Sequence, residues 1–216
     1  MSKNTEATPK NQQGTPESAL TPRARRTRKA LLEAAQKVFE RDGFHNARIT
    51  DIADTAGVAH GTFYTYFSSK ETIFLALVDG FLSELLFPSS PNSEKTRIDS
   101  FERLKKSNRD YLEIYRDYGR IIAIWEELAK YNKEAAEKLK QGEDAFILRA
   151  RRKIEQLQRD GLADPDIDAR YAARALTGMV HKFADTWFSK KEDFEFERAV
   201  EQLSLLWANA LRMKRT

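Results

Sequence analysis

The stretch ITDIADTAGVAHGTFYTYFSSK, residues 49–70, predicts two short helices joined by a tight turn. Thr50 is a suitable N-cap for the first helix, because its hydroxyl can accept a hydrogen bond from a free N–H of the first turn. Gly57 follows this helix at a position where chains commonly adopt a left-handed conformation. The second helix is expected to begin near His60 or Gly61. The pattern as a whole predicts a helix-turn-helix.

The second of these helices has two chemically different faces. Phe63 and Phe67 are one turn apart and therefore share a face. Thr62 and Tyr66 are also one turn apart but point the other way, with Tyr64 on the flank. Such a helix can pack its phenylalanines on a partner helix and still present hydroxyl groups to an external molecule.

This stretch resembles the DNA-binding signature of the tetracycline-repressor (TetR) family of transcriptional regulators. The matching positions are Thr50, Ile52, Ala53, Ala56, Gly57, Val58, Gly61, Thr62, Tyr64, Tyr66, Phe67, Lys70 and Glu71. The resemblance covers about residues 27–86. It implies an all-α protein with an N-terminal three-helix helix-turn-helix DNA-binding domain and a C-terminal helical ligand-binding and dimerisation domain.

Positive charge is concentrated beside the motif. The chain of 216 residues has a net charge of +4, yet residues 22–48 contain eight Lys or Arg against three acidic residues. A basic patch of this kind favours contact with DNA phosphates, although a basic run by itself can also be a solvated helix face.

The apolar periodicity predicts about nine helices and three regions. Residues 1–20 are expected to be a disordered tail, 21–69 the helix-turn-helix domain, and 70–216 the helical regulatory and dimerisation domain. Thr21 and Pro22 are expected to open the first helix, which Gly43 closes.

Several boundaries in the second region follow from capping signals. A capping box at residues 68–71 opens a helix that Pro88 ends, with a short linker after it. A long helix is expected to stop near Gly119, and a new one follows. A further helix covers about 135–159. Asp164 with Pro165 restarts the chain as cap and first helical residue, and the last helix begins near Phe194.

The expected DNA-contacting residues lie in and beside the motif. By resemblance, Tyr64 and Lys70 contact phosphates. Thr62 and Tyr66 face the groove, and Gly61 allows close approach because it has no Cβ. The full set is Arg48, Thr50, His60, Gly61, Thr62, Tyr64, Tyr66 and Lys70.

The last two predicted helices are expected to form a homodimer interface. Their apolar stripes are wide, and pairing with a second copy would give an isologous four-helix seam. The expected interface residues are Met179, Val180, Phe183, Leu203, Leu206, Trp207 and Ala210. The alternative is that these stripes face the core of their own protomer.

Aromatic side chains with polar tips are clustered in the middle helices, as an apolar small-molecule pocket requires. The candidates are Tyr111, Tyr115, Trp125, Phe146, His181 and Trp187. The resemblance implies that such a pocket holds an inducer. The alternative is ordinary core packing, with His181 as a hydrogen-bonded core histidine.

Other classes of protein fit the sequence less well. There is no cysteine, no apolar run long enough to span a membrane, and no hydrophobic signal region, so we expect a cytoplasmic protein. The scattered histidines and the lack of a Gly-rich phosphate loop or an activated nucleophile argue against an enzyme. We expect no catalytic residues, no cofactor and no bound metal.

The sequence therefore predicts a ligand-responsive transcriptional regulator, most simply a repressor. It would bind a palindromic double-stranded operator as a homodimer and be released by a small apolar or amphipathic effector. Two alternatives remain: a helical carrier of small molecules with incidental DNA contact, and a constitutive DNA-binding regulator without ligand.

Overall fold

The structure is a computed structural model that describes residues 20–86 and 99–214, which form eight α-helices and no strand. The chain divides into two compact units between Leu77 and Val78, within one helix. The sequence predicts this boundary at the start of that helix, after Ser69. The expected tail, Pro88 and the linker after it lie outside the described residues, apart from Leu20.

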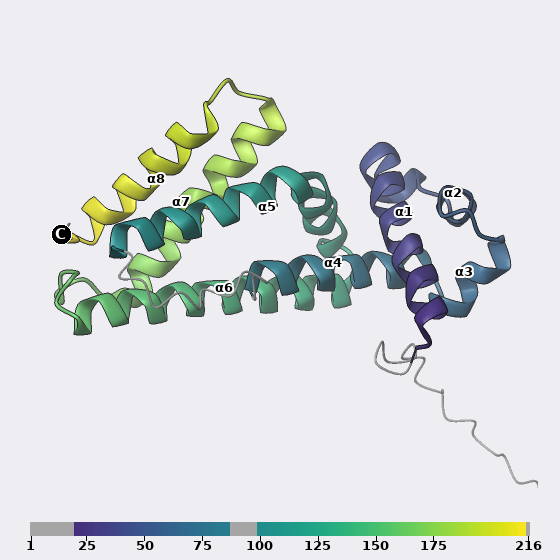
Figure 1. The fold of residues 1–216 in the computed structure, drawn as a ribbon, viewed down its shortest axis with the longest axis horizontal. Coiled ribbons are helices and arrows are strands. Elements are labelled where there is room, and N and C mark those ends of the chain that lie inside the picture. Colours follow the sequence, from purple (N-terminus) through teal and green to yellow (C-terminus); the bar gives the residue numbers. More distant parts are fainter. Residues whose placement is uncertain (1–19, 87–98, 215–216) are drawn as a thin grey trace, which may run out of the picture. The chain divides into compact units, whose positions relative to one another are not determined.

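The N-terminal unit contains α1 (Pro22–Asn46), α2 (Ile49–Thr55), α3 (His60–Tyr66) and the start of α4 (Lys70–Leu86) (Figure 1). The hydroxyl of Thr21 accepts a hydrogen bond from the N–H of Ala24 at 3.3 Å, which confirms the predicted cap of α1. Gly43 has a φ of 73°, so the regular helix ends there, as predicted, and one further turn follows.

Three aromatic rings form the centre of this unit. Phe39 lies edge-on to Phe74 at 5.2 Å between ring centroids, and Phe44 contacts both rings. Phe63 and Phe67 are also buried, from α3 and the residue after it. Since burial of a large apolar side chain contributes about 1.5–3 kcal/mol, this cluster accounts for much of the unit's cohesion.

The turn between α2 and α3 follows the prediction, but the cap of α2 does not. Gly57 has a φ of 67°, the left-handed conformation that glycine adopts without steric cost. Arg48, not Thr50, is the N-cap of α2, and it makes no side-chain capping bond. Thr50 lies inside the first turn, because the helix begins at Ile49.

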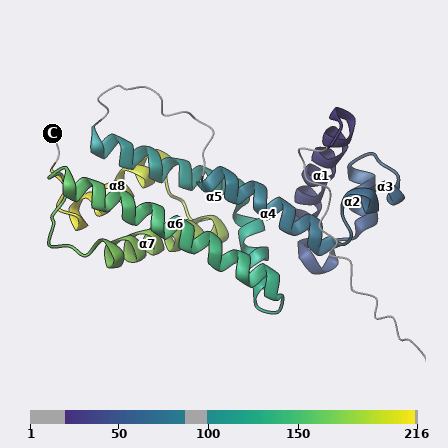
Figure 2. The same cartoon turned by 90° about the horizontal axis from the view of Figure 1, so that it is seen from below.

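The C-terminal unit consists of the end of α4 together with α5 (Ser100–Ala129), α6 (Lys133–Arg159), α7 (Ala169–Lys190) and α8 (Phe196–Ala210). Helices α5, α6 and α7 pack against one another, and α8 packs along α5 and α7 (Figures 1 and 2). Gly142 of α6 permits close contact with α4, since a Cβ there would lie 2.8 Å from Leu82.

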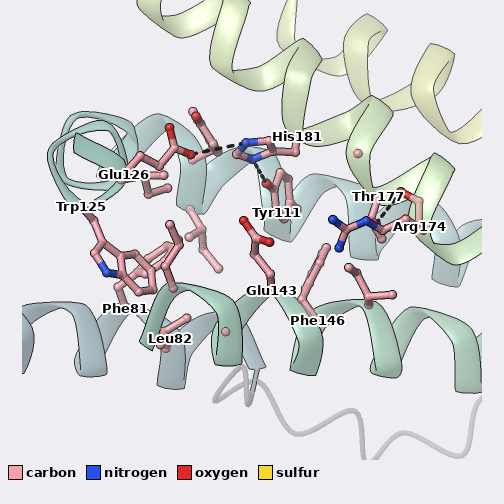
Figure 3. A pocket seen from close by; sticks show the side chains of 17 residues that line it. Phe81, Leu82, Tyr111, Trp125, Glu126, Glu143, Phe146, Arg174, Thr177 and His181 are labelled. Carbon is pink, nitrogen blue, oxygen red and sulfur yellow. Dashed lines mark hydrogen bonds and ion pairs between the residues drawn. The ribbon is translucent and has the colours of Figure 1, made fainter. Parts of the chain in front are cut away.

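The predicted helix end at Gly119 is wrong, which explains why the described residues form eight helices where about nine were expected. Helix α5 continues through Gly119 to Ala129. Tyr111 lies on a part of α5 that runs across Figure 3, whereas the turns carrying Trp125 are seen almost end-on. The helix therefore bends between these residues without ending. An interior glycine costs about 1 kcal/mol relative to alanine. The buried side chains of Tyr115 and Ile121, before and after Gly119 in α5, supply packing that offsets this cost.

The predicted restart at Asp164 and Pro165 is also wrong. The Asp164 carboxylate accepts a bond from the N–H of Asp166 at 2.9 Å, which makes a turn rather than a helix start. Helix α7 begins four residues later, where Asp168 caps it by accepting from the N–H of Arg170 at 2.8 Å. Of the described helices, none has the length and apolar character needed to cross a bilayer.

Candidate functional site

Helix α3 presents the two faces that its sequence predicts. Phe63 is fully buried and Phe67 is nearly so, while Thr62 and Tyr66 are partly exposed. His60, Gly61 and Thr65 are exposed on the same helix. These hydroxyl, imidazole and backbone groups are therefore open to an external molecule.

Tyr64 is the most prominent aromatic side chain of this surface, with 51% of it exposed. Its ring lies edge-on to His60 at 5.3 Å and to Phe63 at 5.4 Å between centroids. These two contacts fix the ring while the phenol group stays in solvent. A phenol held in this way suits a hydrogen bond to a phosphate oxygen.

Lys70 makes contacts within the N-terminal unit that the sequence did not suggest. Its ammonium donates to the carbonyl oxygens of His45 at 3.1 Å and Ala47 at 3.0 Å, and lies 4.8 Å from the centre of the Phe44 ring. Lys70 thus caps the last turn of α1. Because an ammonium has three N–H donors, one remains for a phosphate.

The remaining predicted contacts surround α2. Arg48 and Thr50 are both exposed at the start of that helix. The Thr50 hydroxyl lies 3.4 Å from the Asp51 carboxylate. The first N–H groups of a helix lack intrahelical partners, so this end of α2 can donate to a phosphate.

The basic start of α1 completes this surface. Arg23, Arg25, Arg26 and Lys29 are exposed, and the Arg28 guanidinium lies 5.4 Å from the centre of the Phe67 ring. The structure leaves most of these charges in solvent, where they can attract a polyanion.

The C-terminal unit contains a cavity of about 220 Å³, which we call the aromatic chamber. Its walls come from α4, α5, α6 and α7 and include Phe81, Tyr111, Tyr115, Trp125, Phe146 and His181 (Figure 3). Five of the six predicted pocket residues therefore line one cavity.

A second cavity of about 380 Å³, which we call the basic chamber, lies between α5, α6, α7 and α8. Its lining includes Arg103, Arg149, Lys153, Ile154, Leu157 and Trp207. Tyr111, Ile114, Phe146 and Thr177 line both chambers, so the two are adjacent. Their volumes together fall within the range of about 300–1,000 Å³ that is typical of small-molecule sites.

Three polar side chains contact one another in the wall of the aromatic chamber. The Tyr111 hydroxyl lies 3.0 Å from Nδ1 of His181, whose Nε2 lies 3.6 Å from the Glu126 carboxylate (Figure 3). Burial raises the pKa of Tyr111, with the negative charge of Glu126 adding to the effect. Burial also raises the pKa of Glu126, which His181 partly opposes. His181 thus faces the cavity and is hydrogen-bonded.

Trp187 is the one predicted pocket residue that lines neither chamber. It is buried against Phe188 at 4.5 Å and contacts Phe183, Phe194 and Phe196. This cluster joins the end of α7 to the start of α8. Aromatic periodicity cannot distinguish such packing from a cavity wall.

The predicted interface residues divide into three groups by their exposure. Val180, Leu203 and Trp207 are buried within the protomer, so they pack its own core. Leu206 is 52% exposed and Ala210 is exposed. Met179 and Phe183 form the third group and are partly exposed.

Sequence reasoning missed the charged residues of both chambers. Glu126, Glu143 and Arg174 line the aromatic chamber, and the cations Arg103, Arg149 and Lys153 line the basic chamber. Each is a charged residue on an amphipathic helix, and such residues usually face solvent. Only the packing of neighbouring helices shows that these charged residues border a cavity.

Both units match families of known proteins. Residues 31–77 match the profile described as bacterial regulatory proteins, tetR family. Residues 98–204 match the tetracycline repressor-like C-terminal domain. The uncharacterized HTH-type transcriptional regulator YdgC of Bacillus subtilis is 26% identical over 161 residues, which are 74% of this chain and 80% of that protein.

Two solved structures share the fold. The fatty acid degradation regulator FadR from Bacillus halodurans superposes with a TM-score of 0.70 at 22% identity, covering 90% of this chain and 99% of that one. FadR from Bacillus subtilis in complex with stearoyl-CoA gives a TM-score of 0.67 at 20% identity, covering 83% and 96%.

Proposed function

We propose that this chain, which belongs to the tetR family of bacterial regulatory proteins, is a cytoplasmic repressor that a small amphipathic effector releases from DNA. It is a transcription regulator and not an enzyme. The observation that carries the proposal is the exposed polar face of α3, with Thr62, Tyr64 and Tyr66 outward and Phe63 and Phe67 buried.

In this proposal α3 lies in the major groove and its neighbours hold the phosphates. Thr62 and Tyr66 read base edges, with His60 and Gly61 beside them. Tyr64, Thr50, Arg48 and the free donor of Lys70 contact the backbone. The exposed arginines of α1 add a sequence-independent attraction that weakens as salt rises.

A single module of this size reads few bases, so we propose a homodimer that reads two half-sites of a palindrome. The exposed faces of α7 and α8 support this interface. Tyr171 is 74% exposed, and Ala175 and Gly178 follow it on one face of α7; Leu206 and Ala210 lie on the exposed face of α8. Small residues on α7 would let a partner helix approach closely.

The effector site of this proposal is the pair of chambers in the C-terminal unit. Their apolar walls suit a molecule with an aliphatic chain, and the fatty-acid regulators among the similar folds support an acyl compound as the class. A coupling of about 1–3 kcal/mol between effector and operator would lower DNA affinity by about 5–150-fold.

Selection of bound duplexes from a random pool, followed by fluorescence anisotropy at several salt concentrations, tests the proposal. We expect a palindromic sequence, binding that weakens steeply with salt, and release by an acyl ligand. A small-molecule carrier would bind the ligand and show no salt-dependent DNA binding. A constitutive regulator would bind DNA with no response to any acyl compound.

A further inference from the structure

The two chambers differ in charge. The basic chamber is lined by Arg103, Arg149 and Lys153 against two carboxylates, Asp110 and Asp160. The three cations come from facing helices, with Arg103 on α5 and the other two on α6. An acidic group would therefore find positive charge on two sides of this chamber.

Two of these cations have only neutral hydrogen-bond partners. Arg103 donates to the Ser100 hydroxyl at 3.1 Å, and Lys153 donates to the Ser107 hydroxyl at 3.2 Å. Within the described part of the chain, neither forms an ion pair. The Lys153 side chain reaches solvent, yet burial around its ammonium and, after that, the charge of Arg149 lower its pKa. An anion at this point would offset both effects.

The two carboxylates of the lining are bound to other side chains. Asp110 accepts from the Lys106 ammonium at 3.1 Å, a pair formed within α5. Asp160 accepts from the side-chain amide of Gln156 at 2.8 Å. Both acids therefore have partners of their own, and neither forms an ion pair with Arg103 or Lys153. The charge of Asp110 still acts on Lys153 and offsets part of the lowering of its pKa.

The aromatic chamber has the opposite balance of charge, with the two carboxylates of Glu126 and Glu143 against one cation, Arg174. Glu126 and Glu143 are its acidic groups, and Figure 3 shows Glu143 pointing into the space between Tyr111 and the lower helix. Beyond them the chamber ends at Phe81, Leu82 and Trp125. Figure 3 shows Arg174 on the Phe146 side of the chamber, away from Trp125. The apolar end therefore suits a hydrocarbon chain and not an acidic group.

We propose that the effector is an anionic amphiphile with its acidic head in the basic chamber, against Arg103 and Lys153, and its chain end in the aromatic chamber. This orientation rests on the proposed effector function of the two chambers. The head is a carboxylate or a phosphate-bearing group, since both offer the oxygen acceptors that these cations bind.

Tyr111 and Phe146 separate the two chambers in this arrangement. Both residues line both cavities, and their rings lie 5.3 Å apart between centroids. Tyr111 is held by His181, whereas Phe146 is held only by packing in the described contacts. The hydrocarbon chain of the effector must pass between these two rings. Tyr111 and Phe146 therefore determine which lengths of hydrocarbon chain fit.

Binding of laurate, lauroyl-CoA and 1-dodecanol, measured by calorimetry below their aggregation concentrations, tests the head position. The variant carries Arg103→Gln and Lys153→Met, and the matched control carries Arg152→Gln, an exposed cation of α6 that lines neither chamber. We expect the double variant to bind the preferred anionic ligand at least about tenfold more weakly, with 1-dodecanol and the control little changed.

Comparison of laurate with lauroyl-CoA shows which acidic head group the basic chamber binds. Tighter binding of laurate identifies a free carboxylate, and tighter binding of lauroyl-CoA identifies a phosphate-bearing head; either result supports the orientation if the double variant weakens it. Equal loss for 1-dodecanol, or no loss for either acid, overturns the orientation.

Chain length provides an independent readout. Phe146→Ala joins the chambers, so we expect the preferred acyl chain to lengthen by at least two carbons, with an intermediate shift for Phe146→Leu. The control is Leu148→Ala on the exposed side of α6. An unchanged length preference in a folded variant contradicts the partition.

DNA binding separates this inference from the proposed function. If wild-type protein binds its operator with a steep salt dependence but takes up no acidic amphiphile, the ligand inference fails and the regulator stands. If it binds the amphiphile as described but no duplex, the chamber assignment stands and the regulator proposal fails.

Discussion

The hydroxyl of Tyr111 on α5 and Nδ1 of His181 on α7 are 3.0 Å apart, although the residues are 70 positions apart in the chain. This bond joins two helices across the wall of the aromatic chamber. It also fixes the ring that, with Phe146, separates the two chambers. A contact of this kind links the shape of the cavity to the packing of α7, a helix of the proposed dimer interface.

Replacing Tyr111 by Phe should therefore weaken the fold modestly. The change keeps the ring and removes one hydrogen bond, which contributes about 1 kcal/mol or a shift of about 2–4 °C in melting temperature for a chain of this size. A double-mutant cycle with His181→Phe, followed by thermal unfolding, should give a coupling of the same order. Additive effects of the two changes would show that the contact contributes no stability.

Glu126→Gln should stabilise the protein at neutral pH. Burial, aided by the charges of Asp185 and Glu143, raises the pKa of Glu126, so the folded state disfavours its ionised form. Wild-type stability therefore falls relative to the variant as pH rises through this raised pKa, and the two converge below the ordinary glutamate value of about 4.3. Melting temperatures between pH 4 and 8 measure the difference. A gap that widens toward low pH would contradict the assignment; Asp144→Asn, exposed on α6, is the control.

Lys70→Met should lower stability even without DNA. The ammonium bonds two carbonyls at the end of α1, and their loss should cost about 1 kcal/mol, because the group is only partly buried. Denaturant unfolding measures this cost, and anisotropy measures the loss of DNA affinity. Lys29→Met, in the exposed part of α1, should leave stability almost unchanged. Equal stability of the two variants would assign Lys70 to phosphate contact alone.

Leu206→Glu should give a folded monomer, whereas Leu203→Glu should not fold well. Leu206 is exposed on α8, while Leu203 is buried in the protomer and a charge there has no partner. Sedimentation and circular dichroism distinguish the two outcomes. A dimer that survives Leu206→Glu would place the interface elsewhere.

Tyr64→Phe and Thr62→Ala should affect DNA binding in different ways. The substituted ring would keep the contacts that Tyr64 makes with His60 and Phe63, so only the phenol donor is lost and all duplexes should weaken alike. Thr62→Ala should also change which sequence binds best, by about 1–3 kcal/mol at a contacted base pair. Anisotropy against a panel of single-base operator changes gives both quantities. A uniform loss for Thr62→Ala would remove it from the base-reading set.

The helix-turn-helix could be predicted from the sequence because its determinants are local. The turn depends on a left-handed residue at Gly57, and the face of α3 depends on a spacing of four residues between Phe63 and Phe67. Short-range capping was also readable at Thr21. The prediction that Thr50 caps α2 was wrong by two residues. The exact start of a helix depends on several weak interactions, so it is predictable only to within one or two residues.

Other features were decided only by the tertiary structure. The sequence shows an apolar stripe on α8, but only packing assigns Leu203 to the core and Leu206 to the surface. Lys70 finds its carbonyl partners more than twenty residues away, and Gly119 continues a helix that its propensity would end. The cavity between α5, α6 and α7 likewise depends on side chains that are distant in the chain. Local periodicity determines which faces of a helix are apolar, whereas the competition among those faces for a limited core determines where each one packs.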